Sequence, residues 1–163
     1  MKTVLIRDID ETDEINIPEA DFTLDLRARE VKNCTGCWSC WQKTPGRCAL
    51  KDLDDFYAAY INADRLVLFI QVSCDFISGR LKTLFDRMIP HYLPYTNYQA
   101  GESIHYPRYE RYPDVEVFFK GTFRNQEARQ LFEDYLRRVT YQFHIKKTTV
   151  QSIDEYAEEG ATV

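Results

Sequence analysis

Four of the five cysteines lie within fifteen residues of one another, and they are the residues best suited to chemistry. They follow the spacing Cys34-x2-Cys37-x2-Cys40-x7-Cys48. Three thiolates at three-residue steps, followed by a more distant fourth, are typical of iron–sulfur ligation in ferredoxins. The two tryptophans of this segment, Trp38 and Trp41, could shield such a cluster from water, and solvent exposure helps to set a cluster's potential. The spacing therefore predicts a four-cysteine 4Fe–4S site.

Zinc and unligated thiols are the alternatives for these four cysteines. A structural zinc site usually combines two separated C-x2-C pairs, so the triple spacing fits zinc less well. Unligated thiols would be reduced in a reducing compartment or would pair as a disulfide in air. The fifth cysteine, Cys74, stands apart after an apolar run. We expect Cys74 to be a small buried side chain rather than a redox-active or substrate-facing thiol.

Hydrophobic periodicity predicts the elements that must position these residues. The expected strands are 3–7, 22–26, 65–72, 115–119 and 146–151, and the expected helices are 53–63, 78–88 and 126–143. The continuous apolar run 65–72 is typical of a parallel strand buried on both faces. Five strands with intervening helices predict an α/β fold, a flavodoxin-like five-stranded parallel sheet in a three-layer sandwich. One domain over 1–163 would contain the cysteine loop 34–48.

A tyrosine-rich insertion at 91–113 interrupts this alternation. We expect it near the carboxyl end of the central strand. Open α/β sheets bind ligands at that edge. One interpretation is a surface loop that packs on its own rings. The other is a ligand site: His91 and His105 lie in the insertion, and the segment His105-Tyr-Pro-Arg108-Tyr109 could bind an anionic ligand.

Two further features of the helices have structural explanations. Lys82 and Asp86 are four residues apart on the predicted helix 78–88, which indicates a surface ion pair, and we assign no catalytic role to them or to Arg87. His144 follows the longest helix, where a cation is favourable.

Length and charge restrict the function. A chain of 163 residues with 44% hydrophobic and 29% charged residues has the composition of one folded domain. Its net charge of −5 argues against nucleic acid or anionic lipid as a partner. No apolar run approaches the roughly 20 residues of a membrane span, and the first residues turn acidic too soon for a signal peptide. We expect a cytoplasmic protein.

Three motifs carry a family resemblance. The cysteine segment, the acidic stretch Lys51–Asp55 and the run SGRLKTLFDR at 78–87 resemble, in this order, the iron–sulfur flavoproteins, members of the flavodoxin-like NAD(P)H-dependent FMN reductases. The match covers about 32–90. It implies a flavodoxin-like fold that is dimeric or larger, binds FMN and in some members holds a 4Fe–4S cluster. The positions that match the family's flavin loop are Val72, Ser73, Cys74, Ser78 and Gly79.

The sequence departs from this family at both flavin loops. The acidic run Asp8–Glu14 replaces a glycine- and serine-rich phosphate loop and would repel a phosphate. Asp75 replaces a glycine that lies against the flavin in the family. We therefore expect no FMN in the usual pose on this chain alone. The resemblance predicts a redox or electron-transfer protein, with flavin oxidoreductase activity left open. The alternative is a non-catalytic binding or assembly subunit.

We expect two of the family's usual helices to be missing, the one after the first strand and the one after the last strand. The connection 8–21 is too short for a loop and a helix, and the tail 152–163 is acidic with little apolar stripe. Yet Val4 and Ile6 point opposite to Leu5, so both sheet faces are apolar. We expect one bare face, partly covered by Ile15 and Ile17, that is buried in a homodimer or against a flavoprotein partner.

Overall fold

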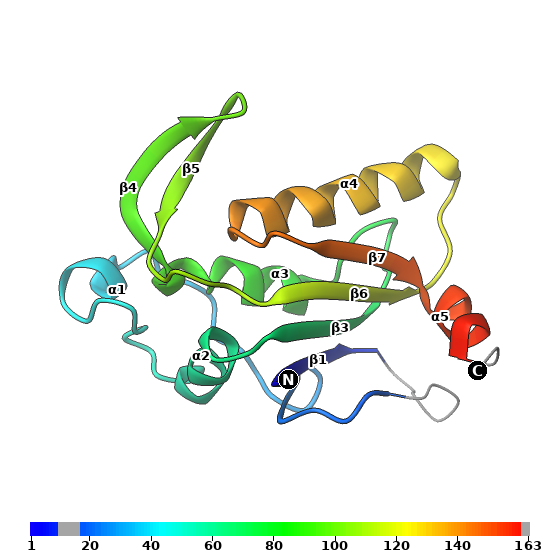
Figure 1. Cartoon of the computed structure of the whole chain (residues 1–163), viewed down its shortest axis with the longest axis horizontal. Coiled ribbons are helices and arrows are strands. Elements are labelled where there is room, and N and C mark those ends of the chain that lie inside the picture. The colour runs from blue at the N-terminus through cyan, green and yellow to red at the C-terminus, as the bar shows by residue number, and fades with distance from the viewer. Residues whose placement is uncertain (10–16, 161–163) are drawn as a thin grey trace.

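The computed structural model describes residues 1–9 and 17–160 and contains a five-stranded parallel sheet (Figure 1). Its strands are β1 (Thr3–Asp8), β2 (Phe22–Asp25), β3 (Arg65–Gln71), β6 (Asp114–Lys120) and β7 (Thr148–Ser152). All neighbours pair in parallel in the order β2-β1-β3-β6-β7, which is the flavodoxin-like order. The predicted fold class is confirmed, and each predicted strand is present within two residues of its expected ends.

Three helices pack on one face of the sheet. They are α2 (Asp54–Ile61), α3 (Gly79–Asp86) and α4 (Gln126–Gln142), each a shortened form of a predicted helix. Phe56, Leu84 and Phe132 from these helices are buried in one core with apolar residues of the strands. The apolar stripe of each helix thus provides the main hydrophobic core.

The second sheet face is covered within the chain, which corrects the expectation of a bare face. Its residues Leu5, Val67, Phe69 and Phe118 are at most 4% exposed. Ile17 and Ala20 of the first connection pack against them, as does Tyr156 of α5 (Ile153–Gly160). Because α5 is only eight residues long, its few apolar side chains left a weak signal in the sequence. The other predicted cover, Ile15, lies outside the described residues.

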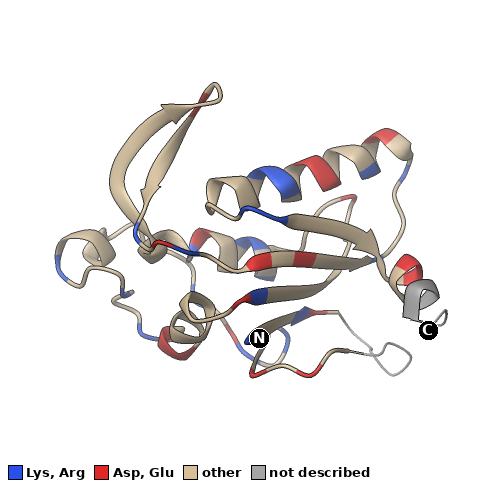
Figure 2. Ribbon diagram, in the orientation of Figure 1, with Lys and Arg blue, Asp and Glu red and all other residues tan. Residues whose placement is uncertain are grey.

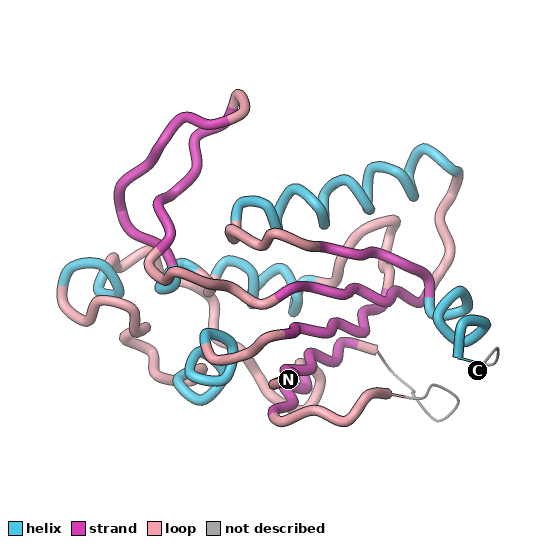
Figure 3. The backbone as a smooth tube through the Cα atoms, viewed as in Figure 1, coloured by secondary structure: helices cyan, strands magenta, loops and turns pink. Residues whose placement is uncertain are grey.

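The insertion forms a projecting β-hairpin instead of a loop. It contains β4 (Tyr92–Gln99) and β5 (Glu102–Pro107), which pair antiparallel after a 3-10 turn at Ile89–His91. Figure 3 shows both strands extending away from the main sheet. Ala100 and Gly101 form the turn with φ of 50° and 85°, the left-handed conformations of a tight hairpin turn.

The insertion also lies at the opposite sheet edge from the one expected. It follows α3 and leads into the start of β6, so it sits at the amino ends of the strands (Figure 1). The segment that follows β3, which carries the predicted flavin residues, lies at the carboxyl ends. The two predicted sites are therefore at opposite ends of the sheet.

Capping interactions fix the helix ends that flank these sites. Ser78 caps α3 by accepting a hydrogen bond from the Leu81 N–H at 3.1 Å. At the end of α4, His144 has a left-handed φ of 58°, and the Ile145 N–H donates to the Thr140 carbonyl, as in a Schellman motif. His144 thus lies beyond the helix, where its Nε2 is 2.5 Å from the His105 carbonyl oxygen. None of the described helices has the length and apolar character to cross a membrane.

Candidate functional site

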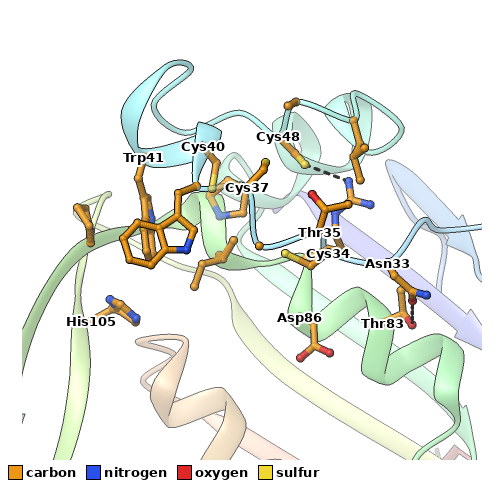
Figure 4. Close-up of a pocket in the computed structure, with 18 residues that line it drawn as sticks. Asn33, Cys34, Thr35, Cys37, Cys40, Trp41, Cys48, Thr83, Asp86 and His105 are labelled. Atoms are coloured by element: carbon orange, nitrogen blue, oxygen red, sulfur yellow. Dashed lines mark hydrogen bonds between the residues drawn. The ribbon is translucent and has the colours of Figure 1, made fainter.

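The four clustered cysteines line one cavity of about 720 Å³ (Figure 4). Its walls come from the cysteine loop, from the end of α3 and from the base of the hairpin. The residues that line it include Cys34, Cys37, Cys40, Cys48, Trp38, Trp41, Arg87 and His105. All four cysteines of the predicted 4Fe–4S site thus line one cavity, and that they bind a cluster stays a prediction.

Left-handed residues allow the cysteine loop to wrap this cavity. Gly36 and Trp38 have φ of 64° and 59° on either side of Cys37, and the short helix α1 (Ser39–Gln42) then carries Cys40 inward. Gly46, with φ of 80°, donates its N–H to the Cys40 carbonyl at 3.0 Å and returns the chain toward Cys48. Cys34 and Cys37 are exposed, Cys40 is buried and Cys48 is half-buried.

The environment shifts the pKa values of two of these thiols in opposite directions. Hydrogen bonds from the Ser39 side chain and backbone and from the Thr35 side chain lower the pKa of Cys37 to about 7. Burial raises the pKa of Cys40, and negative charge on Cys48 and Cys37 would raise it further. At neutral pH Cys37 is thus the thiol more ready to act as a metal ligand or nucleophile.

The four sulfurs do not converge on one point. Within residues 1–9 and 17–160, no group of three or more His, Cys, Asp or Glu side chains is placed to hold a single metal ion. A tetrahedral zinc site needs four donors around one ion. The observed arrangement therefore gives no support to the zinc alternative.

A buried cation, Arg87, reaches one of the cysteines. Its Nη2 donates to Cys48 Sγ at 3.3 Å and to Asp52 Oδ1 at 2.5 Å, and its Nη1 donates to the Lys32 carbonyl. Burial acts to lower the pKa of Arg87, but hydrogen bonding to Asp52 holds that pKa above its usual value. The same contact lowers the pKa of Asp52 to about 2. Both side chains are therefore ionised at neutral pH.

Sequence reasoning missed this role of Arg87. The predicted ion pair between Lys82 and Asp86 is confirmed, but Arg87 turns to the other side of α3 and is almost fully buried. An arginine next to Met88, on the apolar side of an amphipathic helix, was the available signal. A buried arginine requires an acidic partner, which is Asp52.

Aromatic rings form the wall nearest the hairpin. The Trp41 indole donates to the Tyr92 carbonyl at 2.9 Å, and its ring centroid lies 5.2 Å from that of His105. Trp38 packs edge-on against Trp41 but is 59% exposed. Trp41 shields the cavity from the hairpin side, whereas Trp38 remains at the solvent boundary.

The hypothesis of an anion site at His105–Tyr109 stays a prediction, and the structure places the basic residues of the insertion in different surroundings. His91 is fully buried between Tyr57 and Tyr60, and this burial lowers its pKa to about 3. Arg108 donates to the Pro90 and Tyr92 carbonyls. Of His91, His105 and Arg108, only His105 lines the cysteine cavity.

The predicted flavin residues lie together at the other sheet edge. Ser73 and Phe76 close a tight turn by mutual backbone hydrogen bonds, with Cys74 and Asp75 at φ of 50° and 61°. Val72 is buried, whereas Cys74 is exposed, which corrects the expectation of a buried thiol. Asp75 pairs with Arg124. The other two predicted residues lie at the start of α3, where Ser78 is the N-cap and Gly79 is the first helical residue.

The end of β1 does not fit a phosphate group in the flavodoxin pose. Asp8 is fully buried there, accepts a hydrogen bond from the Ser78 hydroxyl and pairs with Arg80 at 3.0 Å. An anion placed beside Asp8 would meet a carboxylate that already pairs with Ser78 and Arg80. Residues 10–14 of the acidic run lie outside the described residues. Among those described, the donor set does not suit FMN bound through its phosphate.

Comparisons with known proteins agree with the fold. No family model matches the sequence, and no curated protein matches it significantly. An FMN-dependent NADH-azoreductase from Bacillus anthracis str. Ames Ancestor, solved in complex with FMN, superposes with a TM-score of 0.60 and 16% identity over 99% of this chain and 98% of that chain. An azoreductase from Bacillus anthracis str. Sterne gives 0.60 and 14% over 98% and 92%. A flavone reductase gives 0.59 and 13% over 93% and 53%. These similarities establish the flavodoxin-like fold.

Proposed function

We propose that this chain is a redox domain that transfers electrons through a 4Fe–4S cluster bound by Cys34, Cys37, Cys40 and Cys48. The observation that carries the proposal is that all four cysteines line one cavity, with the buried guanidinium of Arg87 hydrogen-bonded to one of them. Such a cluster supplies reversible one-electron transfer when it is bound. The fold shared with azoreductases and a flavone reductase supports a redox role.

The geometry favours a cluster over a single ion. In a four-iron cluster each cysteine binds a different iron, so the thiolates surround a volume instead of meeting at one atom. All four cysteines line one cavity of about 720 Å³, which is compatible with the first arrangement. Gly36 lines that volume and has open space around it, so backbone lies beside the cavity there without a side chain.

The chain's own residues would tune such a group. The Arg87 hydrogen bond to Cys48 stabilises negative charge on sulfur, and hydrogen bonds to sulfur are one of the factors that set cluster potentials. Trp41 and His105 exclude water from one wall. Cys37 and Cys34 face solvent, so the site remains open to an external partner on that side.

The flavin is proposed to reside on a partner. The carboxyl edge of this sheet carries Asp8 and Asp75 where an FMN site would lie, and it is at the far end of the sheet from the cysteines. A flavoprotein partner therefore fits better than flavin reduction by this chain alone. The case for a homodimer through the sheet face loses its main support, because that face is covered by Ile17 and Tyr156.

Anaerobic reconstitution with iron and sulfide tests the proposal. We expect about four iron and four sulfide per chain, together with the broad visible absorbance of a cluster. Cys40→Ser and Cys48→Ser should lose most of the iron. Cys74→Ser is the matched control, because Cys74 lies at the other sheet edge, and it should retain full occupancy.

A second candidate function is a non-catalytic binding or assembly subunit. The loss of flavin-binding features at Asp8 and Asp75 favours it. Reconstituted wild-type protein that remains colourless and iron-free would support this candidate and contradict the cluster. Equal iron loss in Cys74→Ser and Cys48→Ser would also contradict the assigned ligands.

A further inference from the structure

The cysteine loop has a charge opposite to that of the chain as a whole. Between residues 31 and 51 there are four basic residues and no Asp or Glu, although the whole chain has a net charge of −5. These residues, which we call the basic rim, are Lys32, Lys43, Arg47 and Lys51. Figure 2 shows Lys and Arg without Asp or Glu along the loop that surrounds α1. The positive charge is thus concentrated around the cysteine cavity.

The basic rim is free to attract an external anion. All four side chains are exposed, and in the described part of the chain none of them forms an ion pair. Three of the acidic residues near the loop already have partners. Asp52 is held by Arg87, Asp55 by Arg29, and Asp86, which lines the cavity, by Lys82.

Exposed aromatic side chains occur on the same side of the molecule. Trp38 is 59% exposed at a left-handed φ of 59°, a conformation that bulky residues rarely adopt. Tyr95, Tyr98 and Tyr106 are exposed on the hairpin whose base lines the cavity. Aromatic side chains are enriched at protein–protein interfaces. The exposed rings near the basic rim therefore point to a protein as the occupant.

We propose that the basic rim and Trp38 form the docking surface for an acidic electron-carrier protein. The partner's role as an electron carrier rests on the proposed function. Its acidic character rests only on the positive charge of the basic rim. The acidic body of this chain would repel a long polyanion. A small protein with a local acidic patch can meet the rim without approaching the acidic remainder.

A binding experiment with two matched charge variants tests this surface. The rim variant is K32A/K43A/R47A/K51A. The control variant K2A/K120A/K146A/K147A removes the same charge from exposed lysines outside the loop. The probes are a 2Fe–2S ferredoxin and an FMN-loaded flavodoxin of strongly negative net charge, titrated calorimetrically at low and high salt. Circular dichroism verifies that each variant is folded.

The wild type and the control variant should bind a probe at low salt and lose affinity as salt is raised. The rim variant should bind at least about tenfold more weakly, with a much smaller dependence on salt. Trp38→Ala should weaken binding without changing the salt dependence. Equal weakening in the rim and control variants would overturn the proposal, as would no binding of either probe at low salt.

Further outcomes separate this proposal from the proposed function. If anionic vesicles or single-stranded RNA bind through the rim more tightly than either acidic protein, the choice of a protein partner is wrong. The titration is made with both iron-free and reconstituted chain. Rim-dependent binding by a chain that holds no iron would support the docking surface while the cluster proposal fails. A chain that holds iron but binds neither probe would support the cluster and overturn the docking surface.

Discussion

Nη2 of Arg87 lies 3.3 Å from Sγ of Cys48 at the wall of the cysteine cavity. The arginine follows α3, and the cysteine ends a loop that precedes α2. The same guanidinium binds the Asp52 carboxylate and the Lys32 carbonyl. One buried side chain thus connects the candidate site to two separate segments of the fold, so the site and the stability of the domain are coupled.

Replacement of Arg87 by Met should lower the free energy of unfolding by about 3–5 kcal/mol, because Asp52 would be left as a largely buried and unpaired charge. Urea unfolding at pH 7 measures this loss. Arg87→Lys, which keeps the charge, should lose less. The double variant with Asp52→Leu should recover part of the loss. A change below about 1 kcal/mol in Arg87→Met would contradict this account.

The ion pair of Asp52 also predicts a pH dependence. Its pKa is lowered from 3.8 to about 2 by Arg87, so the folded state favours the ionised carboxylate. The resulting stability, about 2 kcal/mol, is complete above pH 3.8 and disappears as the pH falls toward 2. Asp52→Asn should therefore be less stable than wild type at pH 7. The difference should shrink between pH 4 and pH 2 in urea titrations, and a constant difference would be inconsistent with this pKa.

His91 should make the domain sensitive to mild acid. Burial lowers its pKa from 6.5 to about 3, so only the unfolded chain takes up a proton in that interval. Stability should fall by about 1.4 kcal/mol for each pH unit below 6.5, or about 2 kcal/mol at pH 5. His91→Leu should remove this part of the slope in thermal or urea unfolding. The same slope in the variant and the wild type would show that another group is responsible.

Gly121 should not tolerate a side chain. It follows β6 with φ of 137°, and an added Cβ would lie 3.0 Å from the Cβ of Val72. Gly121→Ala should cost about 1–3 kcal/mol of unfolding free energy. Gly79→Ala is the matched control, since Gly79 has open space around it and begins a helix, and it should be neutral or slightly stabilising. Equal stabilities of the two variants would be unexpected.

FMN should bind this chain more weakly than micromolar. Asp8 already pairs with Ser78 and Arg80 at the end of β1, and each missing hydrogen bond to a charged phosphate costs about 1.5–3 kcal/mol. Quenching of flavin fluorescence on titration measures the dissociation constant. The double variant Asp8→Ser with Asp75→Gly should bind more tightly than wild type. A submicromolar constant for the wild type would refute this prediction.

The sheet was predictable because its strands carry unambiguous signals. The run 65–72 is apolar at nearly every position, and the stripe of α4 repeats over a long helix. The hairpin was missed because its turn is Ala100–Gly101 instead of the usual Asn-Gly, and its strands mix tyrosine with polar residues. The edge at which it lies depends on α3 crossing back over the sheet, which composition does not reveal.

The spacing of the cysteines indicated which thiols line the cavity, while what they bind stays a prediction. Cys34, Cys37 and Cys40 are three residues apart and cannot separate far, whereas the approach of Cys48 depends on the return of the chain at Gly46. The contact between Arg87 and Cys48 joins residues 39 positions apart, and it depends on how α3 packs rather than on any local pattern. The cover of the second sheet face by Tyr156 is also a long-range contact.

That cover has a consequence for biosynthesis. β1 is made early, and the residues that complete its surroundings on the second face, Ile153 and Tyr156, are made about 150 positions later. Until they emerge from the ribosome, the parts of the Phe69 and Phe118 rings that Tyr156 covers remain accessible to water and to chaperones. Translational pausing before residue 153 would therefore prolong an aggregation-prone nascent state.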